Sequence, residues 1–128
     1  MAQLTRALIV DDNEDHSEML AMLLRTKGYE AETASSATEA LGKCNAEKKY
    51  DLVVSDIGMP GINGYELARQ IRGLPEYDQV VMIALTGFSI YGDRERALNA
   101  GFDDHLTKPV SPHSLIASIE RLRRQKAP

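Results

Sequence analysis

Short apolar runs alternate with longer amphipathic stretches along the 128 residues of the chain. Three runs are continuously apolar, which is typical of strands that a parallel sheet buries on both faces: 7–10, 51–54 and 80–85. Two weaker segments, 29–34 and 102–106, also predict strands, and the alternation of polar and apolar residues in the first favours a position near a sheet edge. The apolar pattern therefore predicts five strands.

Apolar residues at helical spacing fill the segments between these strands. Ser36 and Glu39 have the spacing of a capping box, and Ser111 followed by Pro112 marks the start of the last helix. The predicted helices are 14–28, 36–48, 63–73, 91–101 and 111–124. Five successive β-α units predict an α/β domain in which helices cover both faces of one doubly wound parallel sheet.

Composition argues against several classes of protein. A net charge of −4 is unusual for a general nucleic-acid binder, which normally carries a surplus of basic residues. Cys44 is the only cysteine, so the chain has no internal disulfide and no cysteine zinc site, and it fits a reducing compartment. No apolar run approaches the ~20 residues that span a bilayer, and the N-terminus lacks the features of a secretory signal. We expect a cytoplasmic protein that binds neither nucleic acid nor membrane directly.

The residues just beyond four of the strands carry the candidate chemistry. Asp11 and Asp12 follow the first strand, Asp56 the third, Thr86 the fourth, and Lys108 comes shortly after the fifth. Ligands of open α/β sheets bind outside the carboxyl ends of the strands, so these side chains are expected to meet in one crevice. Three carboxylates and one ammonium leave a formal charge of −2, which one divalent cation neutralises. Oxygen ligands without cysteine or a spaced pair of histidines favour Mg²⁺.

Two further observations limit the ligands and the reactions that fit these residues. The charges of Asp11 and Asp12 repel each other by roughly 4 kcal/mol at ~4 Å near a protein surface unless something positive lies close. Both residues could instead cap the following helix, an alternative that the presence of Asp56 and Lys108 disfavours. The chain contains no glycine-rich nucleotide loop, so a phosphoryl group is not expected to arrive on a bound nucleotide. An aspartate beside Mg²⁺ can itself attack phosphorus and form an aspartyl phosphate.

Four segments of the sequence resemble, in order and spacing, those of receiver domains of two-component response regulators: LIVDDN (8–13), DLVVSDIGMPGINGYEL (51–67), ALTG (84–87) and GFDDHLTKPV (101–110). The resemblance runs from about Arg6 to Arg124. It implies a flavodoxin-like fold with strand order 2-1-3-4-5 and five helices. Residues 1–128 would then form a single receiver domain with a core of about 6–124, and 125–128 would be a tail or a truncated linker.

The resemblance also implies a role for each residue of the predicted site. Asp56 is the expected phosphoacceptor. Asp11, Asp12, Asp56 and the main-chain carbonyl of Gly58 are expected to hold Mg²⁺. Lys108 is expected to pair with the Asp56 carboxylate first and with the phosphoryl oxygens afterwards.

Other positions concern the switch that such domains use. The resemblance implies that Thr86 bonds the phosphate and couples it to the face formed by the fourth helix and the fifth strand. His105 stands where the family usually has Tyr or Phe, although some receivers of hybrid kinases are similar. Gly58 and Phe88 occupy positions that tune the lifetime of the phosphoryl group in the family. The peptide bond before Pro109 is expected to be cis.

Several remaining residues have simpler interpretations. His16 and His113 lie near helix starts and are predicted to be solvated, without a role in phosphoryl transfer. Cys44 is predicted to pack as a small apolar residue. The charged segments 93–96 and 121–124 are predicted to be solvated helix faces.

These features predict a phosphoacceptor receiver domain in two-component or phosphorelay signalling. Its expected partners are a histidine kinase or a histidine phosphotransfer domain, and an effector protein or domain. The domain would catalyse only its own Mg²⁺-dependent phosphorylation and dephosphorylation. One alternative is a Mg²⁺-dependent phosphatase with an aspartyl nucleophile, although Gly58 stands where such an enzyme needs a second aspartate. The other is a vestigial receiver that binds its partner independently of phosphorylation.

Overall fold

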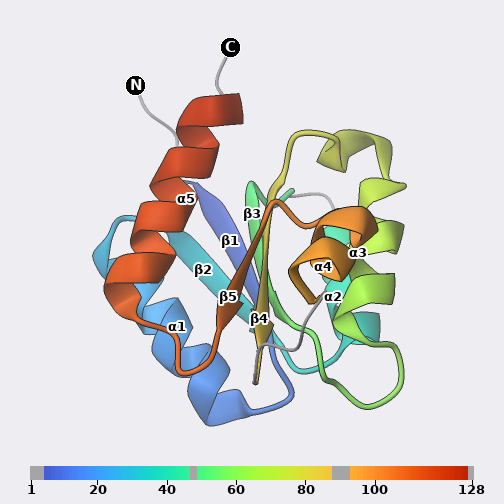
Figure 1. The fold of residues 1–128 in the computed structure, drawn as a ribbon, viewed down its shortest axis with the longest axis horizontal. Helices are drawn as coiled ribbons and strands as arrows, with labels where there is room; N and C mark the ends of the chain where they lie inside the picture. Colours follow the sequence, from blue (N-terminus) through green and yellow to red (C-terminus); the bar gives the residue numbers. More distant parts are fainter. Residues whose placement is uncertain (1–4, 47–48, 88–92, 127–128) are drawn as a thin grey trace.

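A computed structural model describes residues 5–46, 49–87 and 93–126, which form one five-stranded sheet with helices on both faces (Figure 1). The strands are β1 (Arg6–Val10), β2 (Glu30–Ala34), β3 (Leu52–Asp56), β4 (Val81–Thr86) and β5 (Asp104–Thr107). Their order is β2-β1-β3-β4-β5, and each neighbouring pair is parallel. The predicted strands, their order and the edge position of β2 are confirmed.

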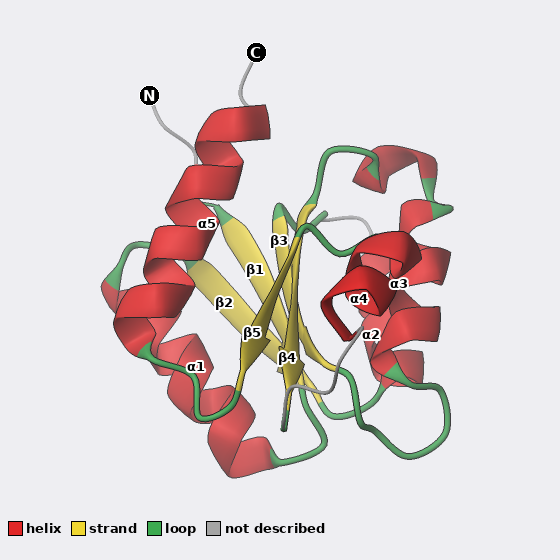
Figure 2. Ribbon diagram, viewed as in Figure 1, coloured by secondary structure: helices red, strands yellow, loops and turns green. Residues whose placement is uncertain are grey.

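Five helices connect and flank these strands, with a short 3₁₀ turn after the third. The helices are α1 (Glu14–Thr26), α2 (Ala37–Cys44), α3 (Gly64–Arg72), α4 (Asp93–Ala100) and α5 (Pro112–Lys126), and the 3₁₀ turn is η1 (Pro75–Tyr77). Figure 2 shows α1 and α5 on one face of the sheet and α2, α3 and α4 on the other. The predicted cap of α2 forms, because the hydroxyl of Ser36 accepts the Glu39 N–H. Residues 47–48 and 91–92 of two predicted helices lie outside the described residues.

Side chains of the strands alternate between two hydrophobic cores, one on each face of the sheet. The first core packs against α1 and α5 and includes Ala7, Ile9, Leu20, Leu24, Val54, Ile83, Leu115 and Ile119. The second packs against α2, α3 and α4 and includes Leu8, Val10, Cys44, Val53, Leu67, Ile71, Met82 and Ala97. Cys44 is fully buried, as predicted. The two cores fix the strands from both sides and so fix the positions of their ends.

Helix α5 continues beyond the point where the sequence predicts a tail. It runs to Lys126, whose Nζ lies 3.1 Å from Oδ1 of Asp103 and donates to the Val80 carbonyl at 3.2 Å. Residues 125–126 thus continue the last helix, whose end contacts the residues just before β4 and β5. No helix in the described part of the chain is both long and apolar enough to cross a membrane.

Candidate functional site

The parallel register brings residues from distant parts of the chain to one edge of the sheet. Asp56 pairs with Leu85, and Thr86 pairs with Thr107, so the carboxyl ends of β3, β4 and β5 lie level. The backbone N–H of Lys108, one residue later, donates to the Thr86 carbonyl at 2.7 Å. The predicted site residues therefore gather at the carboxyl edge, where open α/β sheets bind ligands.

Asp11, Asp12 and Asp56 form an acidic cluster, in which one carboxylate oxygen from each lies within 4.8 Å of the others. Asp11 and Asp56 are buried, with 1% and 6% of their surfaces exposed, whereas Asp12 is exposed. This oxygen donor set fits Mg²⁺, which binds one or two carboxylates and keeps several waters. Gly58 lines the cavity beside Asp56, and the role of its carbonyl stays a prediction. The N-cap of α1 is Asn13, so helix capping does not explain the adjacent aspartates.

Lys108 reaches into the acidic cluster from the loop after β5. Its Nζ lies 3.2 Å from Oδ2 of Asp56 and 3.5 Å from Oδ2 of Asp11. The peptide bond between Lys108 and Pro109 is cis, as predicted. One ammonium beside three carboxylates leaves a formal charge of −2, which matches the charge of a divalent cation.

The fold shifts the pKa values of the two buried carboxylates in opposite directions. Burial raises the pKa of Asp56 above its ordinary value; the charge of Asp11 adds to this effect, and Lys108 opposes it. Burial also acts to raise the pKa of Asp11, but hydrogen bonds from His16 and Asn13 and the charge of Lys108 outweigh it, so that pKa is lowered. Asp56 is therefore the carboxylate whose negative charge benefits more from an added cation.

His16 belongs to the site, and the prediction that it is solvated is wrong. Only 18% of its side chain is exposed, and its Nδ1 lies 2.5 Å from Oδ2 of Asp11. An ionised carboxylate can only accept, so the imidazole donates. A signal for this contact exists in the sequence: Asn13 caps α1, and a side chain three residues after a cap can reach back over it. His113 is exposed, as predicted.

Thr86 and His105 are bonded to each other across neighbouring strands. The Thr86 Oγ1 and the His105 Nε2 lie 3.1 Å apart. Thr86 is buried and His105 is partly buried, so the hydrogen bond is only partly exposed to water. A phenylalanine at position 105 could not make this bond. Phe88 lies outside the described residues.

Asp104, next to His105, joins α4 to α5. The guanidinium groups of Arg94 and Arg121 each lie 3.0 Å from one of its oxygens, and the Ser118 hydroxyl donates to the same carboxylate. The two arginines were expected on solvated helix faces, and their side chains are indeed 60% and 48% exposed. That prediction is incomplete, because both charges are paired with a carboxylate that the sheet buries.

Gly64 allows a close approach between the start of α3 and the end of β3. Its N–H donates to the Ile57 carbonyl at 2.9 Å, and a Cβ on Gly64 would lie 2.5 Å from the Asp56 carbonyl oxygen. Because real Cβ atoms do not approach a backbone atom so closely, glycine alone fits here without a shift of the Asp56 main chain. The start of α3 thus helps to hold Asp56 in place.

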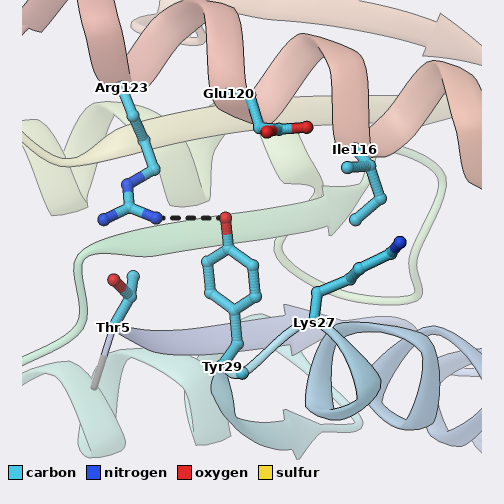
Figure 3. A pocket seen from close by; sticks show the side chains of 7 residues that line it. Thr5, Lys27, Tyr29, Ile116, Glu120 and Arg123 are labelled. Carbon is cyan, nitrogen blue, oxygen red and sulfur yellow. Dashed lines mark hydrogen bonds between the residues drawn. The ribbon is translucent and has the colours of Figure 1, made fainter.

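Two of the cavities in the described part of the chain lie at opposite ends of the strands. The first, of about 380 Å³, opens beside the acidic cluster and is lined by Asp56, Ile57, Gly58, Tyr65, Thr86, Gly87, Asp93, Arg96 and Lys108. The second, of about 270 Å³, lies at the amino ends of the strands, where Arg123 of α5 donates to the Tyr29 hydroxyl at 3.2 Å (Figure 3). No residue of the acidic cluster lines the second cavity, so the chemistry of the site belongs to the first.

The model of the response regulator receiver domain matches residues 7–120. The chain belongs to this family. An uncharacterized 14.6 kDa protein of Leptolyngbya boryana is 40% identical to the receiver domain, over 89% of this chain and 86% of that protein. The transcriptional regulatory protein CpxR homolog of Haemophilus influenzae is 38% identical, over 97% of this chain and 52% of that protein. The structure of the chemotaxis protein CheY4 of Vibrio cholerae has a TM-score of 0.88 at 28% identity, covering 94% of this chain and 99% of CheY4.

The family defines the general role of the receiver domain, which is signalling in two-component systems. Receivers of this family act with histidine kinases and with effector domains. The chain spans about half the length of several transcriptional regulators that it matches, including 49% of ResD of Bacillus subtilis and 52% of the CpxR homolog.

Proposed function

We propose that this receiver domain accepts a phosphoryl group on Asp56 from a phosphohistidine and thereby changes the surface that its partners bind. One observation carries the proposal: Nζ of Lys108 lies 3.2 Å from Oδ2 of Asp56, inside the cluster that Asp11 and Asp12 complete. A buried carboxylate with a raised pKa, a neighbouring cation and further oxygen ligands suit an acyl phosphate that needs charge compensation.

Asp11, Asp12 and Asp56, with the main-chain carbonyl of Gly58, are the proposed ligands of Mg²⁺. Support for this set comes from the oxygens of the three carboxylates, which lie within 4.8 Å of one another. Mg²⁺, when bound, offsets the negative charge of the phosphoryl oxygens and of the attacking carboxylate. His16 orients Asp11 by its hydrogen bond, as outer-shell groups do for ligands in other metal sites.

The transfer begins when a carboxylate oxygen of Asp56 attacks the phosphorus of the phosphohistidine. A P–O bond forms and the P–N bond breaks; its electron pair returns to the imidazole nitrogen of the donor, which takes a proton from solvent. Lys108 then pairs with the phosphoryl oxygens, which carry a charge of about −2. Hydrolysis ends the signal: water attacks the same phosphorus, inorganic phosphate leaves, and the Asp56 carboxylate is restored.

The hydroxyl of Thr86 is the proposed sensor of this modification. In the unmodified domain it is bonded to Nε2 of His105. After transfer it donates to a phosphoryl oxygen, and His105 loses its partner. Because Thr86 ends β4 and His105 lies on β5, the change reaches the face that α4 and β5 form.

The proposed phosphodonor is a histidine kinase or a histidine phosphotransfer domain, and the proposed reader of the switch is an effector protein or domain. Such a donor places the reaction in the cytoplasm, where a reduced thiol such as that of Cys44 is expected. Residues 1–128 are proposed to act as one receiver domain.

The proposal is tested by incubating the protein with Mg²⁺ and acetyl phosphate and weighing the intact chain. We expect an adduct of about 80 Da that requires Mg²⁺ and is absent from Asp56→Asn. Asp51→Asn is the matched control, because Asp51 directly precedes β3 and so lies at the opposite end of that strand from Asp56.

Other outcomes identify the alternatives. An adduct that persists in Asp56→Asn would overturn the assignment of the phosphoacceptor. Release of phosphate from many phosphate esters without an adduct would favour the phosphatase. The absence of both an adduct and measurable Mg²⁺ binding would indicate a vestigial receiver.

A further inference from the structure

The cavity beside Asp56 has a wall that the proposed transfer does not use. Tyr65 of α3 and Asp93 and Arg96 of α4 line this wall. The two helices lie side by side (Figure 1). The cavity has a volume of about 380 Å³. A phosphoryl group on Asp56 would therefore fill only part of it, and its oxygens would face groups other than Lys108 and Thr86.

Arg96 is held at this wall by stacking on a buried aromatic ring. Its guanidinium carbon lies 4.5 Å from the centroid of the Tyr65 ring, which is a cation–π contact. Tyr65 and Ala97, the residue after Arg96 on α4, are both buried, so packing fixes the ring and the helix. Stacking uses the flat face of a guanidinium and leaves the N–H groups at its edge available as donors. Arg96 is therefore a positioned donor at the rim of the cavity.

Arg96 also differs from the basic residues near it in its ion pairing. Within residues 5–46, 49–87 and 93–126 it forms no ion pair, whereas Arg94, two positions earlier, lies 3.0 Å from Asp104. Lys108 is already shared between two carboxylates. The formal charge of −2 on the cluster, with Lys108 counted, is already matched by one Mg²⁺. Phosphorylation of Asp56 adds about one further negative charge, which a second cationic side chain would offset.

We propose that Arg96 binds the phosphoryl oxygens of modified Asp56, as a second cation beside Lys108. This inference rests on the proposed function of Asp56. Asp93 lines the same wall, and its negative charge repels a phosphoryl group on Asp56. The positive charge of Arg96 offsets this repulsion. Because Arg96 lies on α4, its bond to the phosphoryl group ties that helix to the modified state by a route that does not pass through Thr86.

Beryllofluoride with Mg²⁺ is a suitable probe, because it is a tetrahedral anion that bonds to a carboxylate oxygen as a phosphoryl group does. The bound fraction of the full chain is measured by NMR as beryllium is added at fixed Mg²⁺ and fluoride. We expect Arg96→Gln to weaken beryllofluoride binding about tenfold, the loss of one charged hydrogen bond. Arg94→Gln removes the same charge from the same helix and should change binding less than twofold.

Three further measurements separate binding by Arg96 from a structural role. Arg96→Lys should recover part of the affinity, since it keeps the charge and loses the planar fork. Tyr65→Leu should reproduce part of the loss, whereas Tyr65→Phe should not, because phenylalanine keeps the stacking ring. Mg²⁺ binding without beryllofluoride should be no weaker in Arg96→Gln than in wild type, because the variant removes a positive charge near a cation site.

The outcomes distinguish this inference from the function on which it rests. If wild type fails to bind beryllofluoride, or if Asp56→Asn binds it equally well, the proposed function fails. If wild type binds it and Arg96→Gln binds it as tightly as Arg94→Gln does, the role of Arg96 is refuted and the function of Asp56 stands. Equal losses of Mg²⁺ and beryllofluoride affinity in Arg96→Gln would also refute it, as they indicate a general disturbance of the site.

Discussion

Nδ1 of His16 lies 2.5 Å from Oδ2 of Asp11, so a hydrogen bond ties the first turn of α1 to the end of β1. The other oxygen of Asp11 accepts the Asn13 N–H at 2.9 Å. We expect His16→Ala to weaken Mg²⁺ binding about tenfold, because groups that orient metal ligands have effects of that size. Calorimetric titration with Mg²⁺ measures the difference.

Two controls accompany the His16 prediction. His16→Asn retains an N–H donor close to Cβ and should keep most of the affinity, while His113→Ala removes an exposed imidazole and should keep all of it. Equal Mg²⁺ affinity in His16→Ala and wild type would show that Asp11 needs no support from the imidazole.

The bond between Thr86 and His105 predicts an effect on phosphorylation. His105→Phe removes it, at a net cost to the unmodified state of about 0.5–1.5 kcal/mol. The Thr86 hydroxyl is then available to the phosphoryl group, so a limiting concentration of acetyl phosphate should modify about threefold to tenfold more protein at equilibrium. Intact-mass measurement gives the modified fraction, and His113→Phe is the control. A lower modified fraction in His105→Phe would mean that the imidazole assists the modified state.

The lowered pKa of Asp104 should make the stability of the domain depend on pH. Burial acts to raise its pKa, but hydrogen bonds from Ser118, His105 and Arg94 and the charge of Arg121 outweigh it, so the pKa is lowered. A carboxylate with a lowered pKa in the folded state contributes stability above its unfolded pKa and loses it as pH falls through the folded value. Asp104→Asn should therefore lower the free energy of unfolding by about 1–3 kcal/mol at pH 7.

The same difference should shrink as the pH falls below about 4, because Asp104 takes up a proton in the unfolded chain first and in the folded domain only at lower pH. Urea denaturation at several pH values measures it, with Asp78→Asn as an exposed control. A difference between wild type and Asp104→Asn that is constant over the acid range would exclude the carboxylate charge as its source.

Replacement of Asp56 should change the free energy of unfolding at neutral pH in the opposite direction to replacement of Asp104. Its pKa is raised by burial and by Asp11, although Lys108 opposes the shift, so ionised Asp56 reduces the stability of the metal-free fold. We expect Asp56→Asn to raise the free energy of unfolding by about 1 kcal/mol without Mg²⁺. Mg²⁺ should then stabilise wild type more than the variant. Thermal unfolding with and without Mg²⁺ tests both statements, and a less stable metal-free variant would contradict the first.

The positions of Asp56 and Lys108 could be predicted because each depends on a strand. A continuous apolar run marks the strand, and parallel strands joined by right-handed crossovers end at one edge of the sheet. The contact of Arg96 could not be predicted in this way, and for His16 the sequence offers only its spacing from the Asn13 cap. Each residue of a helix is rotated by about 100° from the one before, so an error of one residue in the helix start redirects a side chain. The ion pairs of Arg94 and Arg121 could not be predicted for a second reason. Both arginines pair with Asp104, which lies on another element, and such contacts depend on how the elements pack together.

The close contact at Gly64 limits how this domain can be redesigned. Loop exchange between β3 and α3 is an obvious way to graft a different ligand specificity beside Asp56. Any transplanted loop must still deliver a residue without a side chain to the first position of α3, where a Cβ would press on the Asp56 carbonyl at 2.5 Å. Libraries that randomise this segment should therefore spare position 64, or most of their members will carry a displaced aspartate.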